Sequence, residues 1–126
     1  MNIISVGVIN NVSSDTLDLD YQIDGLPYTV MFKSPHPDDY YQGYLILVDI
    51  RIKYHSVFNQ IKSLKLKHPH VPIVVCGYPA NADERLIAPQ YIKCIQYKVQ
   101  YMEIDRHDDF QKPGRYLLDT YIKKSI

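Results

Sequence analysis

The chain lacks the features that mark several classes of protein. It has no tryptophan, few cysteines and glycines, and as many acidic as basic residues, so its formal net charge is zero. Bulk electrostatics therefore do not favour binding to nucleic acid or to an acidic membrane. No apolar run approaches the roughly 20 residues of a membrane span, and no basic segment precedes an apolar stretch near the N-terminus. We expect no membrane or nucleic-acid partner.

The two cysteines do not resemble a disulfide framework. Cys76 falls in a predicted strand and Cys94 in a predicted helix. Isolated thiols of this kind indicate a reducing compartment, here the cytoplasm or the nucleus. The 126 residues suit one domain, residues 1–126, and 46% hydrophobic content indicates an ordinary folded core. The bias towards Tyr, Ile and Lys over Ala is typical of AT-rich genomes, such as those of parasites and insect-associated viruses.

Alternating and continuous apolar patterns predict the strands. Residues 2–9 are almost wholly apolar and β-branched, which indicates a strand covered on both faces. Residues 16–23 alternate between apolar and polar side chains, as in an edge strand. Asp24 and Gly25 predict a hairpin turn into a strand at 26–32, antiparallel to its predecessor. Further strands are predicted at 44–50, 73–77 and 99–104.

Helices are predicted between these later strands and after the last one. Residues 54–67 place apolar side chains at three- and four-residue spacings. A weaker pattern covers 89–97, and a final helix covers 113–124, with Asp108 or Asp109 near its start. This order predicts an α/β domain with a mostly parallel sheet, one antiparallel edge strand and helices on its faces.

The same segments carry a resemblance. "LILVDI", "VPIVVCGYPAN" and "VQYMEIDRHDDFQKP" resemble the fourth strand, the fifth strand with its guanine motif, and the sixth strand with its base loop of Ras-superfamily small GTPases. The Ran family is the most similar. "YQIDGLPYTVMFKSP" is similar to the hairpin before the second switch, and "GVINNVSS" has the length of the phosphate loop. The resemblance implies a small-GTPase-like fold.

The phosphate and metal positions of those GTPases have changed. A phosphate loop needs a second glycine and a lysine, but Val12 and Ser13 stand there. Ser14 keeps the hydroxyl of the magnesium-binding position. In the second-switch motif Asp-x-x-Gly, Lys33 replaces the carboxylate and His36 replaces the glycine whose N–H meets the γ-phosphate. The electrostatic and backbone requirements for phosphate are both lost.

The base-binding positions have changed as well. Residues 78–81 read Tyr-Pro-Ala-Asn where the motif is Asn-Lys-x-Asp, and residues 105–107 read Asp-Arg-His where it is Ser-Ala-Lys. We interpret the nucleotide site as emptied and expect no catalytic residue, cofactor or metal. A remnant site using Asn81, Asp105 or His107 is the less favoured alternative, and His68 with His70 lacks a third metal ligand.

The chain before residue 16 is too short for the family's first helix and first switch. We therefore expect apolar area of the strand at 2–9 to be uncovered. Self-association, a docked protein or a rearrangement of residues 10–20 would cover it. A homodimer through this face is one expected outcome.

The resemblance leads to a function without catalysis. It implies a Ran-like pseudo-GTPase that binds proteins, with nuclear-transport factors as candidate partners, and that competes with the active GTPase. The alternatives are a binder or hydrolase of another phosphorylated ligand at the strand-end crevice, and a structural homodimeric subunit. Tyrosines near the second switch and lysines of the first predicted helix are the candidate contacts, although packing or a solvated helix face would also explain them. The candidate partner-binding residues are His36, Asp38, Asp39, Tyr40, Tyr41, Tyr44, Lys62 and Lys65.

Overall fold

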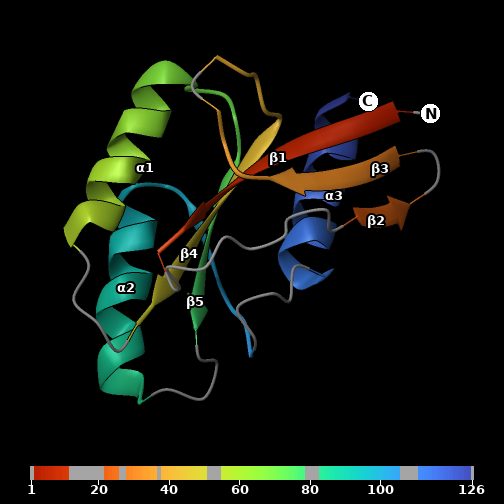
Figure 1. The fold of residues 1–126 in the computed structure, drawn as a ribbon. Coiled ribbons are helices and arrows are strands. Elements are labelled where there is room, and N and C mark those ends of the chain that lie inside the picture. The colour runs from red at the N-terminus through yellow and green to blue at the C-terminus, as the bar shows by residue number, and fades with distance from the viewer. Residues whose placement is uncertain are drawn as a thin grey trace.

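A computed structural model describes residues 2–11, 22–25, 28–36, 38–50, 55–78, 83–105 and 111–125. Within these ranges the chain forms strands, helices and their connections (Figure 1). The strands are β1 (Asn2–Asn10), β2 (Gln22–Gly25), β3 (Tyr28–Lys33), β4 (Gly43–Asp49), β5 (Ile73–Tyr78) and β6 (Gln100–Glu103). The helices are α1 (His55–Lys67), α2 (Glu84–Gln96) and α3 (Gln111–Ser125).

The strands form one sheet in the order β2-β3-β1-β4-β5-β6. Every neighbouring pair is parallel except β2 and β3, which are antiparallel. This confirms the predicted α/β class with a mostly parallel sheet and one antiparallel edge strand. Val6 of β1 pairs with Phe32 on one side and with Gly43 on the other. Because β3 ends where β4 begins, at the middle of β1, the chain between them passes across β1.

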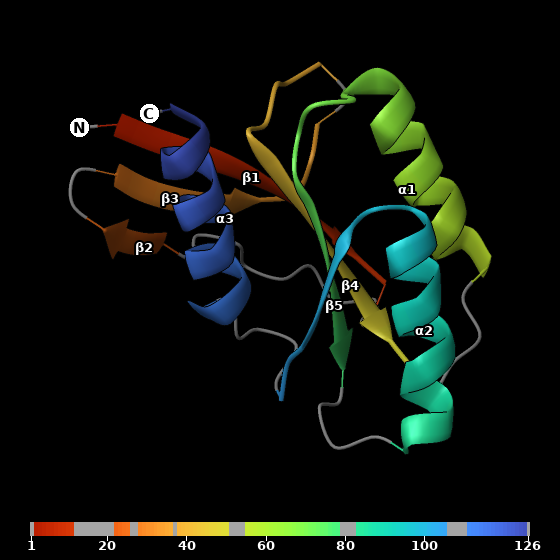
Figure 2. The same cartoon turned by 180° about the vertical axis from the view of Figure 1, so that it is seen from behind.

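Helices cover both faces of the sheet. Figures 1 and 2 show α1 and α2 side by side on one face and α3 on the other. One core cluster joins sheet residues such as Val6 and Leu45 to Leu117 of α3. A second cluster joins Ile46 and other sheet residues to Val57 and Ile61 of α1 and Cys94 of α2. The alternation of strand side chains divides the core between the two faces.

The expectation of an uncovered apolar face on β1 is wrong. Ile4, Val6 and Val8 expose 2%, 0% and 1% of their surface. They belong to the core cluster that contains Leu117, so contacts within one chain already shield these side chains from solvent. The predicted homodimer through this face therefore loses the exposed area that motivated it. The predicted absence of a first helix and the rearrangement of 10–20 concern a segment that, apart from residues 10 and 11, lies outside the described ranges.

The hairpin is antiparallel as predicted, but its turn is not at Asp24 and Gly25. Both residues pair within the sheet, Asp24 with Thr29 and Gly25 with Tyr28. In the observed register Ile23 lies opposite the buried Val30. Because this register continues through Asp24 and Gly25, β2 extends two residues beyond the point where the local turn signal would end it. Most of the predicted strand at 16–23 lies outside the described ranges.

Helix α2 begins five residues before its predicted start. The Asp83 carboxylate accepts a hydrogen bond from the Arg85 amide at 2.9 Å and so caps the first turn. Pro89 therefore lies inside the helix and does not begin it. At the other end, Lys98 adopts a φ of 58°, and its amide and that of Val99 donate to Ile95 and Cys94 carbonyls. These two bonds form a Schellman motif, and Lys98 stands at its left-handed position, where glycine is the usual residue.

The remaining helices agree more closely with their predictions. Helix α1 begins one residue after its predicted start and ends at the predicted residue, Lys67, while α3 begins two residues early, at Gln111. Asp108 and Asp109 lie outside the described ranges. None of the helices in the described part of the chain combines the length and apolarity required to cross a bilayer.

Candidate functional site: the β3–β4 loop

The loop between β3 and β4 is fastened to β1 by Gln42. The Gln42 amide donates to the Ser5 carbonyl at 2.9 Å, and the Ser5 amide donates to Gln42 Oε1 at 2.7 Å. Backbone and side chain thus hold the same pair of residues. The crossing segment is therefore positioned by the sheet at its β4 end, although it contains two prolines in the sequence.

Tyr41 holds the other half of the loop. Its side chain is 3% exposed, and its hydroxyl accepts a hydrogen bond from the His36 amide at 2.9 Å. The same hydroxyl donates to the Ser34 carbonyl at 3.4 Å. His36 is the position where the resemblance places the N–H that meets a γ-phosphate. In this chain that N–H already has an internal partner.

The Tyr44 ring packs against β1 at Gly7, where β1 has no side chain. A Cβ at Gly7 would lie 3.0 Å from Cδ1 and Cε1 of the Tyr44 ring, so the glycine makes room for the ring. Tyr44 is 4% exposed and meets Tyr41 edge to face at 5.6 Å. Burial, followed by the nearby Tyr41 and Tyr40, raises the pKa of the Tyr44 phenol. The hydroxyl is therefore neutral at physiological pH.

His68, in the turn after α1, joins the buried and exposed tyrosines. Its ring stacks on Tyr44 at 5.8 Å and meets Tyr40 edge to face at 6.2 Å. Tyr40 exposes 67% of its surface. An exposed aromatic ring supported by a buried one is well suited to contact a partner, because it loses little conformational entropy on binding.

A shallow pocket of about 240 Å³ adjoins the Tyr44 and His68 rings. It brings together three predicted contact residues, His36, Asp39 and Tyr44, with Lys67, one of the lysines of the first predicted helix, and with His68, which is not among the predicted contacts. In the sequence, His68 is paired only with His70, a combination that lacks a third metal ligand. His68 lies close to the tyrosines because it precedes β5, Tyr44 begins β4, and these two parallel strands start side by side. The residues lining the pocket are Pro35, His36, Asp39, Tyr44, Lys67 and His68.

The predicted set of partner-binding residues does not form one surface. Lys62 Nζ lies 5.6 Å from the centre of the Tyr97 ring, and Lys65 Nζ donates to the Lys98 carbonyl at 3.2 Å. Both lysines face the end of α2 and the start of β6. Tyr41 is buried and supports the loop, whereas Asp38 and Tyr40 are exposed. Lys62 and Lys65 therefore lie apart from the loop residues, because α1 directs them towards the end of α2.

Few positions of the predicted nucleotide site are described. Lys33, at the end of β3, and Asp105, after β6, are exposed, and Tyr78 ends β5. Residues 12–14, 79–82 and 106–107 lie outside the described ranges. Across the ranges that the structure describes, no three His, Cys, Asp or Glu side chains converge as metal ligands.

The two thiols are buried and unbonded. Burial raises the pKa of Cys76, and it raises the pKa of Cys94 to about 12. A protonated, enclosed thiol is a poor nucleophile. Both cysteines therefore act as small core side chains.

Comparison of the sequence with models of known protein families gives no match, and comparison with curated proteins gives none either. The physical features of the site are therefore the basis for a functional proposal.

Proposed function

We propose that this chain is a catalytically inactive, Ran-like pseudo-GTPase that works as a protein-interaction module without a nucleotide. Its candidate partners are nuclear-transport factors, for which it would compete with an active GTPase in the cytoplasm or nucleus. Two observations support the proposal: the sequence resemblance, and a β3–β4 loop whose conformation is fixed by hydrogen bonds to the Tyr41 and Gln42 side chains.

The hydrogen bond from the His36 amide to the Tyr41 hydroxyl carries this proposal. A γ-phosphate sensor needs a free backbone N–H that a ligand can take up and release. Here the buried Tyr41 hydroxyl accepts the hydrogen bond that the phosphate would accept. Lys33 stands where a metal-directed carboxylate would be. The loop is thus kept in one arrangement by internal bonds, and at position 33 a cation replaces the negative charge that would favour Mg²⁺.

The exposed part of the loop supplies a contact surface. Tyr40 is held by His68, which in turn rests on Tyr44, and the adjoining pocket offers the Lys67 ammonium and the Asp39 carboxylate. Aromatic anchors with charged neighbours are common at protein interfaces. We expect the partner to contact Tyr40 and this pocket.

We expect no thermal shift when the protein is titrated with GTP, GDP or ATP in the presence of Mg²⁺. A ligand present at one hundred times its Kd would raise the free energy of unfolding by about 2.7 kcal/mol, which calorimetry detects easily. A clear shift would contradict the proposal. It would favour the alternative of a binder or hydrolase of a phosphorylated ligand.

Partner capture tests the positive half of the proposal. A panel of purified nuclear-transport factors is passed over the immobilised chain, and Tyr40→Ser is compared with Ile3→Ser. Ile3 is also an exposed apolar side chain, at 52%, but it lies at the start of β1. Tyr40→Ser should abolish binding, and Ile3→Ser should leave it unchanged. Equal binding by both variants would exclude this surface, and capture of no factor would remove the proposed partner class.

A further inference from the structure

Strand β6 forms one edge of the sheet and has hydrogen-bonding groups that face outward. Among the described residues it pairs with β5 alone. The Ile104 amide donates to the Gly77 carbonyl on β5 at 3.0 Å. Because backbone groups alternate along a strand, Tyr101 and Glu103 direct their N–H and C=O groups away from β5. The outward Tyr101 carbonyl accepts a hydrogen bond from Gln100 Nε2 at 3.2 Å, an exposed side chain that a partner strand would displace. Figure 2 shows β6, in light blue, running along the outer side of β5 between α2 and α3.

An apolar strip on α2 adjoins this edge. Tyr91, Ile92 and Ile95 expose 51%, 54% and 59% of their surfaces. The Tyr91 ring meets the Tyr101 ring of β6 edge to face at 6.2 Å, which places this side of α2 beside the edge. Ile95, four residues on, lies on the same side of the helix. Exposed apolar side chains next to an open strand edge mark a surface for association.

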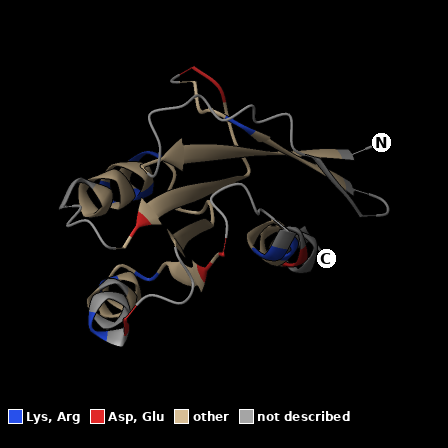
Figure 3. Cartoon of the chain, turned by 60° about the horizontal axis from the view of Figure 1, so that its bottom comes forward, with Lys and Arg blue, Asp and Glu red and all other residues tan. Residues whose placement is uncertain are grey.

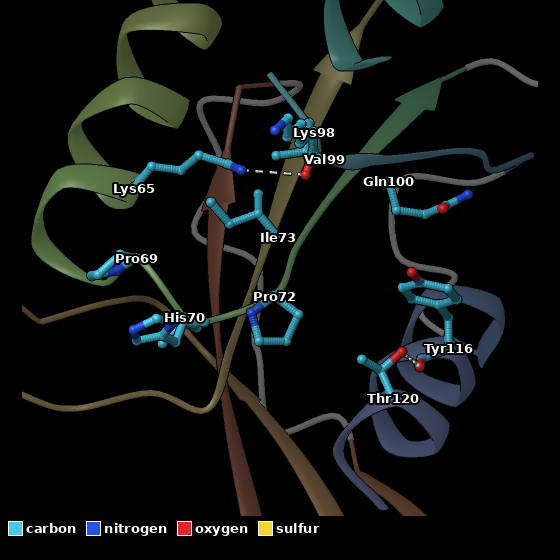
Figure 4. A pocket seen from close by; sticks show the side chains of 11 residues that line it. Lys65, Pro69, His70, Pro72, Ile73, Lys98, Val99, Gln100, Tyr116 and Thr120 are labelled. Carbon is cyan, nitrogen blue, oxygen red and sulfur yellow. Dashed lines mark hydrogen bonds between the residues drawn. The ribbon is translucent and has the colours of Figure 1, made fainter. Parts of the chain in front are cut away.

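The two ends of β6 carry opposite charge. A pocket of about 390 Å³ lies at its first end, with Lys65, His70 and Lys98 and no carboxylate among its lining residues (Figure 4). Glu103 and the exposed Asp105 lie at the other end. Figure 3 shows this order of colours, with basic residues before β6 and acidic residues at its end.

We propose that a second copy of this chain adds to the open edge, through antiparallel pairing of the two β6 strands. A twofold axis perpendicular to the sheet keeps both α2 helices on the same face, so their apolar strips meet. Antiparallel pairing lays the Glu103–Asp105 end of one copy beside Lys98 and the basic pocket of the other, twice by symmetry. Parallel pairing would bring like charges together. The order of charges along β6 therefore favours antiparallel pairing with the β6 of a second copy.

The oligomeric mass tests this proposal. Sedimentation equilibrium on the full chain should give twice the 14.7 kDa chain mass, falling to one chain mass on dilution. Ile95→Lys and Glu103→Pro should give the single-chain mass at concentrations where the parent is dimeric. The proline removes an N–H that faces outward and leaves the bonds to β5 intact. Leu66→Lys is the matched control, since Leu66 is 86% exposed on α1, and it should remain dimeric.

A charge exchange tests the orientation. Asp105→Lys alone should weaken dimerisation about tenfold at low salt, because two symmetric pairs become repulsive. Adding Lys98→Asp to the same chain should restore the parental dissociation constant. Circular dichroism confirms that each variant is folded.

A single-chain mass at every concentration would overturn the proposal, and so would a dimer that Leu66→Lys disrupts and Ile95→Lys does not. If the edge instead captures a different protein while the chain stays monomeric, the second copy is excluded as its occupant. None of these variants alters the β3–β4 loop, so the nucleotide and partner experiments are decided independently.

Discussion

Replacing Tyr41 with alanine is expected to lower the free energy of unfolding by about 3–5 kcal/mol, the range for loss of a buried aromatic side chain. Tyr41 is 3% exposed and belongs to the core cluster on the α1 and α2 face. Its removal leaves a cavity beside Tyr44 and frees the two loop groups that its hydroxyl binds. Urea unfolding followed by circular dichroism measures the loss.

The Tyr41→Phe variant separates the hydroxyl from the ring. It keeps the packing and removes the bonds to the His36 amide and the Ser34 carbonyl, so it should cost about 1 kcal/mol. Tyr40→Ala is the neighbouring control, because a 67% exposed side chain should change stability by about 0.5 kcal/mol or less. Equal losses for Tyr41→Ala and Tyr40→Ala would show that Tyr41 does not anchor the loop.

Replacing Gly77 with alanine is expected to cost about 1–3 kcal/mol through overpacking. A Cβ at Gly77 would overlap the Tyr101 hydroxyl and lie 2.7 Å from Cζ of the same ring. Tyr101 is 8% exposed and packs in the core, so its ring cannot swing into solvent without losing that burial. Thermal and urea unfolding should both report the destabilisation.

Tyr101→Phe provides the test of this explanation. The Tyr101 hydroxyl is buried without a hydrogen-bond partner in the described part of the chain, so its removal should leave stability unchanged or raise it. Combined with Gly77→Ala, it should recover part of the loss, because one overlapping atom is gone. Strictly additive effects in this double-mutant cycle would contradict the contact.

Gly43→Ala is the matched glycine control. A Cβ there would lie 3.2 Å from Cδ2 of Leu117, an aliphatic side chain that needs only a small shift. It should therefore cost less than Gly77→Ala. A larger cost at Gly43 would show that the close packing of Tyr101 over β5 is not the limiting contact.

Much of the fold could be predicted because its signals are local. The apolar run at 73–77 became β5, Ile73–Tyr78, and the run at 44–50 became β4, Gly43–Asp49. The helical spacing at 54–67 became α1, His55–Lys67. In each case a run or spacing of apolar side chains matches the period of the element that buries them.

The errors arose where a local signal competed with a distant one. Pro89 is a common first residue of helices, but Asp83 caps α2 six residues earlier. Asp24 and Gly25 are favoured in turns, but pairing with β3 keeps them in the strand. The residue types of the β3–β4 loop pointed to a contact surface, whereas the addition of Lys67 and His68 required the turn after α1 to be placed beside it.

The sequence by itself determined the α/β class and the positions of most strands and α1, because these depend on residue types and periods within short segments. The tertiary structure alone decided that β1 is covered, that the Tyr41 hydroxyl accepts the hydrogen bond of the His36 amide, and that Lys62 and Lys65 face the end of α2 rather than the loop. These depend on strand register and helix placement, which bring together residues far apart in the chain and which no short segment specifies.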